Sequence, residues 1–290
     1  MRSPRTRLAS AAALGLLCGA IASGCGGGDA KKPTSAAPVS QDVLAPANFG
    51  NPATGANRWD PMLPGRQSVR EGRVNVGHRP LTHRRVYTVT NLTKRINGVP
   101  AAVVIDQDFN GGQLAEQALD YLAEDKQGNV WYLGSYTETY EGGRFVNATD
   151  GWLAGVRGAR AGIMMQAHPK AGTSFYESRS LGRAGDPAQV VKTGQTKCVP
   201  FRCFNDVVVI GEGARSDQPE YKYYAPGVGG ILTEPRYKGG EQETELLINA
   251  TQLTPRGLAE VSAAALKVDR HARVVSPRVF GNAASAKPGV

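Results

Sequence analysis

One short run of oxygen-bearing side chains in the sequence could hold a metal ion. Asp106, Asp108 and Asn110 alternate and are followed by a glycine, which matches the start of a calcium loop, where alternate side-chain oxygens converge on a hard cation. The pattern requires a glutamate at its twelfth position, but the sequence has Gln117 there and Glu116 one place early. A hairpin turn with solvated acids is the competing interpretation. Asp106, Asp108 and Asn110 are therefore a candidate calcium site.

The four histidines of the sequence show no metal-ligand spacing. His78 and His83 lie five residues apart in a basic segment, so we expect both to be solvated. The sequence has no Gly-x-Ser-x-Gly elbow, no His-Glu-x-x-His pair and no phosphate-binding loop. It therefore predicts no enzyme, no catalytic residue and no cofactor.

Cys198 and Cys203 are the two cysteines that lie beyond the N-terminal segment. Outside the cytoplasm, two thiols this close in the chain usually pair, and facing positions of a tight hairpin bring Cα atoms within disulfide range. A redox pair is the alternative, but the spacing is not Cys-x-x-Cys and no helix N-terminus is evident to acidify a thiol. We expect a structural disulfide between Cys198 and Cys203.

The N-terminal segment has the features of an export signal. Three arginines with no acidic residue precede an apolar run over 8–21, which is too short to span a membrane. Ala22-Ser23-Gly24-Cys25 follows and resembles the lipobox of bacterial lipoproteins. That resemblance implies a signal peptide over 1–24 and a diacylglycerol anchor on Cys25; an ordinary secretory signal with an incidental cysteine is the alternative. Residues 25–42 are predicted to be a flexible linker.

From residue 43 to residue 251 the sequence alternates apolar and polar residues between turn signals. Asn97-Gly98 is the strongest hairpin signal, whereas 151–172 is rich in small residues and predicts irregular structure. Successive strands joined by a few residues cannot hold crossover helices, so they predict an antiparallel meander. About ten to twelve strands accumulate enough twist to curl a sheet. We therefore predict an all-β domain over 43–251, a curved sheet, half-barrel or barrel rather than a sandwich.

The last part of the sequence changes to helical spacing. Thr254 can cap a helix and Pro255 suits its first position, so one helix is predicted over 255–272, covering an edge or the open mouth of the sheet. The end of the segment 252–290, from residue 277 on, is predicted to be a loose tail. The segment is basic, which favours either docking to an anionic lipid or wall polymer or a plain solvated surface.

Several segments of the β domain are similar to one family of proteins. They are Asp125-Lys-Gln-Gly-Asn-Val-Trp-Tyr-Leu-Gly134, Tyr140-Glu-Gly-Gly143, Ala161-Gly162-Ile163-Met164-Met165, His168-Pro169-Lys-Ala-Gly172 and Lys222-Tyr-Tyr-Ala-Pro-Gly-Val-Gly229. Over about 50–251 they resemble an uncharacterised family of secreted and lipid-anchored bacterial proteins. The chain departs from that pattern at Ser68-Val69-Arg70, where an aromatic residue is expected. Because the motifs are turn and aromatic signatures, the resemblance implies an envelope β-domain and no chemistry.

Composition and the export signal together limit the function. Lys and Arg number 34 against 25 Asp and Glu, a net charge of +9, but the predicted export excludes nucleic acid as a partner. We expect a non-catalytic envelope protein, anchored to the membrane through Cys25, that binds an apolar ligand or an envelope partner. Trp131, Trp152, Tyr223 and Tyr224 could line its pocket if they are not structural. A structural or wall-contacting module without a cavity is the alternative.

Overall fold

A computed structural model describes residues 44–289 of the chain, except 77–78, 180–185, 214–218 and 238–242. All of these residues belong to the unit formed by 35–290. The predicted signal peptide, the linker up to residue 42 and Cys25 lie outside the described residues, as does His78. Within the described part of the chain, no helix combines the length and the hydropathy of a membrane span.

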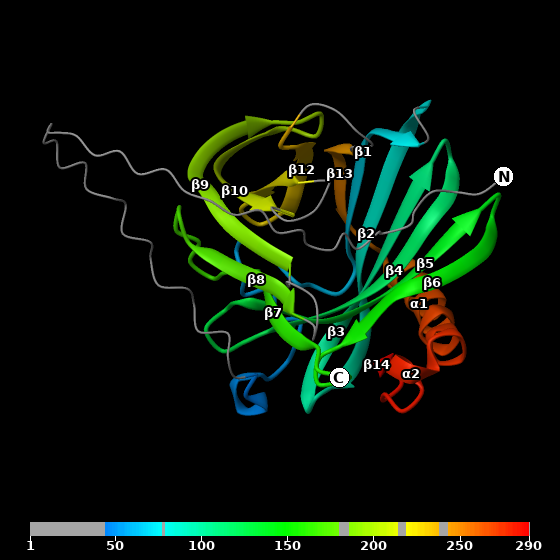
Figure 1. Ribbon diagram of the computed structural model, residues 1–290. Helices are drawn as coiled ribbons and strands as arrows, with labels where there is room; N and C mark the ends of the chain where they lie inside the picture. Colours follow the sequence, from blue (N-terminus) through cyan, green and yellow to red (C-terminus); the bar gives the residue numbers. More distant parts are fainter. Residues whose placement is uncertain (1–43, 77–78, 180–185, 214–218, 238–242, 290) are drawn as a thin grey trace, which may run out of the picture. The chain divides into compact units, whose positions relative to one another are not determined.

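The described chain is built almost wholly of antiparallel strands (Figure 1). The strands are β1 (Arg66–Val76), β2 (Arg79–Ile96), β3 (Val99–Asn110), β4 (Gln113–Glu124), β5 (Val130–Glu141), β6 (Arg144–Leu153), β7 (Arg160–Met165), β8 (Ser174–Arg179), β9 (Asp186–Cys198), β10 (Cys203–Glu212), β11 (Glu220–Ala225), β12 (Gly229–Pro235), β13 (Thr244–Gln252) and β14 (Lys287–Pro288). The helices are a 3-10 turn η1 (Pro46–Asn48), α1 (Pro255–Val275) and the short α2 (Pro277–Phe280).

Twelve of these strands close into a barrel. Their order is β1-β13-β12-β11-β10-β9-β8-β7-β5-β4-β3-β2, and β2 pairs with β1 again to complete the ring. Strand β6 pairs with β5 outside the ring, and β14 pairs with β2. The prediction of a large antiparallel meander with a C-terminal helix is confirmed, and the sheet takes the barrel form.

The predicted turn at Asn97-Gly98 joins β2 to β3. Asn97 has φ 45° and Gly98 has φ 82°, the left-handed values that a two-residue hairpin turn requires and that Asn-Gly accepts most easily. The turn sets the register, because Ile96 then faces Val99 and the pairing runs from there along both strands.

The segment predicted to be irregular holds strand β7. Its register with β8 brings the chain so close at Gly162 that a Cβ there would lie 2.0 Å from the carbonyl oxygen of Tyr176. A glycine is therefore needed inside the strand. The small residues that suggested a loop here are instead a requirement of close strand packing.

Helix α1 begins as the sequence predicts. The Thr254 hydroxyl accepts a hydrogen bond from the Gly257 amide at 3.2 Å, and Pro255 opens the first turn. The helix does not cover an edge or a mouth of the barrel, as the sequence suggested. It packs across the outer face of β2, β3 and β4 (Figure 1), where Ala265, Val268 and Ala272 are buried.

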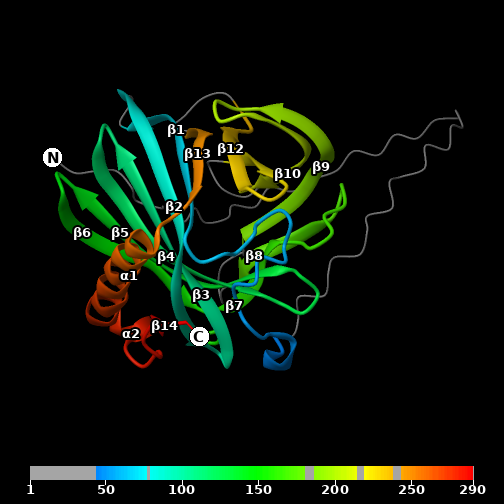
Figure 2. The ribbon, with the colours of Figure 1, turned by 180° about the vertical axis from the view of Figure 1, so that it is seen from behind.

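The C-terminal residues predicted to be a loose tail are packed. Phe280 of α2 is fully buried and stacks edge-on against Tyr136, with a ring separation of 5.3 Å. Figure 2 shows α2 and β14 directly below α1, beside β2 and β3. Burial of one large aromatic ring contributes about 2 kcal/mol. This contribution helps to hold the short C-terminal segment around α2 against the sheet.

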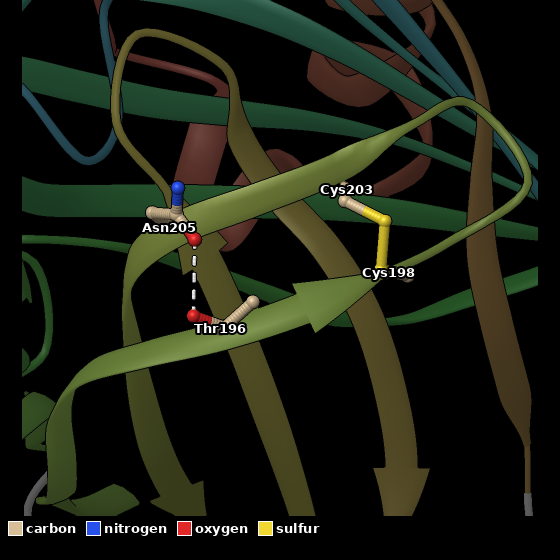
Figure 3. Close-up of a disulfide and its surroundings, with 4 residues drawn as sticks. All are labelled: Thr196, Cys198, Cys203 and Asn205. Carbon is tan, nitrogen blue, oxygen red and sulfur yellow. Dashed lines mark hydrogen bonds between the residues drawn. A yellow bond between two sulfur atoms is a disulfide. The ribbon is translucent and has the colours of Figure 1, made fainter.

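The hairpin between β9 and β10 carries the predicted disulfide. Cys198 and Cys203 face each other across the two strands and are bonded (Figure 3). Beside them Thr196 donates to the Asn205 side-chain oxygen at 3.0 Å. The tip of the hairpin reaches back to β13, because the Phe201 amide donates to the Leu247 carbonyl at 3.1 Å. The disulfide thus stiffens a hairpin that folds over the barrel wall.

Candidate functional sites

The three residues of the predicted calcium motif lie in strand β3, not in a loop. Because they alternate, their side chains share the face of the sheet opposite to α1, which is the interior of the barrel. Asp108 pairs in register with Arg85 of β2, and Asn110 with His83. The predicted acids therefore face a basic strand.

Two of the three predicted residues are held by side chains of β2. The Arg85 guanidinium donates from Nε to both oxygens of Asp106, each at 2.9 Å, and from Nη2 to Oδ2. The Asn110 side-chain oxygen lies 2.7 Å from Nδ1 of His83. Asp108 has no such close partner, and its Oδ1 is buried without a hydrogen bond.

Strand β13 completes the cluster from the other side of β1. Glu245 is 1% exposed, and its Oε1 lies 3.3 Å from Nε2 of His83 and 3.4 Å from Nη1 of Arg85. Its second oxygen forms an ion pair with Nε of Arg70 at 3.0 Å. We call Arg70, His83, Arg85, Asp106, Asp108 and Glu245 the interior charge cluster.

The cluster shifts the pKa of its members in opposite directions. Burial alone would raise the pKa of Glu245, but Arg70 and Arg85 are so close that it falls well below the ordinary value. Burial alone would lower the pKa of His83, but hydrogen bonds with Glu245 and Asn110 raise the pKa to about 9. Burial raises the pKa of Asp108 well above the usual range, against the opposing effect of Arg85. The interior thus holds compensated, buried charge.

His83 was predicted to be solvated, and this prediction is wrong. The residue is 2% exposed and lies in β2. The alternating positions Leu81, His83, Arg85 and Tyr87 would have pointed to it, because they form one face of a strand. Sequence alone does not show that this polar face closes on itself rather than meeting water.

The calcium prediction for Asp106, Asp108 and Asn110 stays a prediction. The geometry of these three residues gives it little support. Arg85 occupies both oxygens of Asp106, and the pairing of residues 108–110 continues the β ladder. A calcium loop needs side-chain and main-chain oxygens converging from a turn. The strand supplies them in a row instead.

A second charged group lies on the opposite wall of the barrel. Nζ of Lys222 contacts Oε2 of Glu212 at 2.5 Å and Oε1 of Glu220 at 3.1 Å. Burial raises the pKa of Glu177 well above its ordinary value, and the charge of Glu212 adds to that shift. Much of the interior face is therefore charged, which gives an apolar ligand no continuous apolar lining there.

A separate cavity of about 740 Å³ lies on the surface. It forms where the segment before β1 meets the β4–β5 and β7–β8 turns and the hairpin of β9 and β10. The lining comes from Arg58 and Trp59, the turns Lys126–Gly128 and Ala167–Lys170, Thr193 and Gly194 of β9, and Asp206 and Val208 of β10. Two segments of the family resemblance, at 125–134 and 168–172, thus contribute turns to one cavity.

Buried hydrogen bonds hold the walls of this cavity in place. The carboxylate of Glu124, 3% exposed, accepts hydrogen bonds from the amides of Thr54 at 3.0 Å and Asn57 at 3.0 Å. The Asn57 side chain donates onward to the carbonyls of Gly128 at 2.8 Å and Gln166 at 3.4 Å. Glu124 and Asn57 therefore join the segment before β1 to the β4–β5 turn and to the end of β7.

The rim of the cavity is basic. Lys126, His168 and Lys170 are exposed along it, and the Arg58 guanidinium lies 4.8 Å from the ring centroid of Trp59. The one acid of the lining, Asp206, pairs with Arg58 at 2.8 Å. The two lysines are left to set the local potential, which attracts anions.

The four aromatic residues singled out in the sequence do not line this cavity. Trp131 packs edge-on against Phe49 at 5.9 Å and donates from Nε1 to Asp125 at 2.8 Å. Trp152 packs against Tyr132, while the Tyr223 hydroxyl donates to Glu234. These contacts are those of structural residues.

No protein-family model matches the chain, and no curated protein matches its sequence. Two solved structures are similar to it. One is a proposed exported protein with a YmcC-like fold from Bacteroides fragilis, at 13% identity and a TM-score of 0.33; the other is a proposed lipoprotein from Parabacteroides distasonis, at 12% identity and a TM-score of 0.31. Each comparison covers 67% of this chain and 99% of the other. Neither likeness is strong enough to indicate a function for this chain.

Proposed function

We propose that this chain is a non-catalytic envelope protein, exported and anchored through Cys25, whose surface cavity binds an anionic ligand. The observation that carries the proposal is a cavity of about 740 Å³ rimmed by Lys126 and Lys170, with its acid Asp206 already paired to Arg58. This volume lies within the range of about 300–1,000 Å³ that ligand sites occupy.

The geometry favours an anion over the apolar ligand expected from the sequence. An apolar ligand needs a continuous apolar lining, whereas this rim presents ammonium groups and an imidazole. The ligand is of the class of a carboxylate- or phosphate-bearing envelope polymer, because such chains offer repeated charges to two lysines on one rim. The N-terminal signal and the bonded Cys198–Cys203 pair support a place outside the cytoplasm.

The absence of catalysis is part of the proposal. Among the lining residues that the structure describes, no hydrogen bond or ion pair joins the imidazole of His168 to a carboxylate or to the hydroxyl of Thr193. Nucleophilic or acid–base chemistry needs such groups within hydrogen-bond reach of each other. The cavity is built to bind.

A charged and an uncharged probe of the same size test the binding. The purified protein is titrated with short dextran sulfate and with plain dextran of equal length, at low and at physiological salt. We expect only the sulfated probe to bind, and we expect salt to weaken its binding. The double variant Lys126→Ala with Lys170→Ala should bind the sulfated probe about tenfold more weakly than the natural chain does. Lys267→Ala with Arg270→Ala removes the same charge from the exposed face of α1 and is the matched control. Equal losses in the two double variants would show that net charge binds the probe and would contradict a site.

The anchor is tested separately. Cys25→Ser leaves the signal in place but removes the sulfur to which the lipid would attach. We expect the variant to appear in the soluble envelope fraction and the natural chain to partition into detergent. Detergent partitioning of the variant would contradict the anchor and leave the cavity result untouched.

A further inference from the structure

We propose that the interior charge cluster is a binding site for one divalent transition-metal ion of the Zn²⁺ class, held by His83, Asp108 and Glu245. The site is separate from the surface cavity. From the predicted calcium motif it takes Asp108 as a ligand and Asn110 as the hydrogen-bond partner of His83.

The three ligand atoms are already gathered. One ligand atom from each of His83, Asp108 and Glu245 lies within 4.8 Å of the other two. Nε2 of His83 is 3.3 Å from Oε1 of Glu245 and 3.8 Å from Oδ1 of Asp108. Metal bonds of about 2.0–2.2 Å place neighbouring ligand atoms roughly 3.3 Å apart in a tetrahedral site. The observed separations are close to what one small ion needs.

The imidazole is oriented as metal-binding histidines are. Nδ1 of His83 lies 2.7 Å from the side-chain oxygen of Asn110 and so carries a proton, which leaves Nε2 as the other ring nitrogen to bind a cation. A second partner of this kind fixes the tautomer and the ring in many metal sites. Asn110, which the sequence suggested as a direct ligand, is the residue that positions the histidine.

Within the described residues, the charged groups near Nε2 of His83 are all carboxylates. The His83 side chain is 1% exposed, and Nε2 lies near oxygens of Glu245, Asp108 and, at 4.0 Å, Glu243. Oδ1 of Asp108 is itself buried without a hydrogen bond. A buried nitrogen among carboxylate oxygens requires a cation between them, and the choice is between a proton on the ring and a metal ion.

The site holds more acids than arginines. Asp106, Asp108 and Glu245 form ion pairs with the guanidinium groups of Arg70 and Arg85, and Glu243 lies beside His83. Four acids thus surround two arginines, and the third cation of the cluster is either a protonated His83 or a metal ion. Arg85 bonds mainly to Asp106, and Arg70 bonds to the second oxygen of Glu245. Arg85 also lies 3.4 Å from Oε1 of Glu245 and 3.7 Å from Oδ1 of Asp108, longer contacts than those it makes with Asp106.

The ligand types select the metal. One imidazole nitrogen with carboxylate oxygens suits Zn²⁺ and its neighbours among the first-row ions, whereas Ca²⁺ takes six to eight oxygens. Entry is available beside Glu243, whose side chain is 37% exposed, so that this residue is also placed to become the fourth ligand. His83 and Glu245 are shielded from water, and the Asp108 side chain is 22% exposed.

Cobalt is the probe that reports both occupancy and ligand geometry. The untagged purified protein is treated with a chelator, dialysed, and titrated with Co²⁺ while the visible absorption of the bound ion is followed; Zn²⁺ is then added to displace it. We expect one Co²⁺ per chain, an absorption band typical of a four-coordinate site, and its loss on adding Zn²⁺. Elemental analysis after equilibrium dialysis gives the stoichiometry independently.

Variants assign the site. Asp108→Asn and His83→Gln are expected to abolish stoichiometric binding, and Asn110→Ala to weaken it about 10- to 100-fold. Glu71→Gln removes a carboxylate from neighbouring β1 whose side chain is 49% exposed and contacts Arg84, and should bind as the natural chain does. Because a variant at a buried position can fail to fold, the near-UV circular dichroism of each variant is compared with that of the natural chain. Glu243→Gln changes a side chain that is 37% exposed, so it should weaken metal binding without disturbing the core.

Two results would overturn the proposal. One is the absence of stoichiometric Co²⁺ or Zn²⁺ binding by the natural chain, which would show that a proton on His83 alone balances the cluster. The other is binding that is the same in the natural chain, Asp108→Asn and Glu243→Gln, which would place the ion elsewhere on the surface.

Discussion

The contact between α1 and the barrel includes a buried ion pair that can be tested by substitution. Nζ of Lys94 on β2 lies 2.7 Å from Oδ1 of Asp269 on α1, and the two side chains are 0% and 1% exposed. The other oxygen of Asp269 accepts the Ala286 amide at 3.0 Å. The ammonium also lies 5.4 Å from the ring centroid of Tyr121. The pair therefore joins the outer face of the sheet, the helix and the C-terminal segment.

Removal of the carboxylate alone should be costly. Asp269→Leu leaves a buried ammonium without its counter-ion, which costs about 3–5 kcal/mol, and leaves the Ala286 amide unpaired, which adds about 1 kcal/mol. For a protein of this size we expect the melting temperature to fall by roughly 10 °C or more. The double variant Lys94→Met with Asp269→Leu removes both charges, and only the unpaired amide remains, a loss of about 1–2 kcal/mol.

Urea unfolding followed by tryptophan fluorescence gives these free energies, and calorimetry gives the melting temperatures. Arg256→Ala on the same helix is the control, because its ion pair with Glu260 is 90% and 64% exposed and should contribute less than about 0.5 kcal/mol. The reasoning is refuted if the single Asp269→Leu variant is as stable as the double variant, since the buried lysine would then need no partner.

Two further substitutions test the fold. Burial, and then the charge of Glu124, raise the pKa of Asp60 from 3.8 to about 6, although the charges of Arg70 and Arg66 oppose the shift. The protonated carboxyl therefore stabilises the native state below pH 3.8. About 3 kcal/mol of that stability is lost as the pH rises through 6. Asp60→Asn should flatten this part of the pH profile of urea stability, and an unchanged slope would contradict the buried carboxyl. At Gly72 a Cβ would lie 1.7 Å from the Thr244 carbonyl oxygen, so Gly72→Ala should destabilise the β1–β13 pairing by about 3 kcal/mol or more. Gly50→Ala, where a Cβ meets nothing within 4 Å, is its control, and equal melting temperatures for the two variants would argue against the barrel closure.

Local patterns predicted the strands and turns better than they predicted which face meets water. The Asn97-Gly98 turn and the disulfide hairpin follow from short-range chemistry, and both are present. His83 and Asp108 lie on faces that alternate polar with apolar residues, which in an open sheet would mark the solvent side. In the barrel that polar side turns inward, and only pairing between strands far apart in the sequence decides this.

The surface cavity could not be predicted for a related reason. Its turns at Lys126 and His168 are visible in the sequence as turns. Nothing local indicates that Asn57, many residues earlier, hydrogen-bonds to both of them. The packing of the tail after residue 277 could not be predicted from the sequence either, because the burial of Phe280 depends on a surface that α1 and the sheet create together.

The pairing of β1 with β13 has a consequence for biogenesis. The seam of the barrel joins residues 66–73 to residues 244–252, so synthesis from the N-terminus delivers one side of the seam long before the other. Until β13 has been made, β1 and β12 expose edges that can pair with other chains, and such non-local closure is slow. Pairing of these edges with other chains before residue 252 has been made is therefore the main misfolding hazard of this barrel.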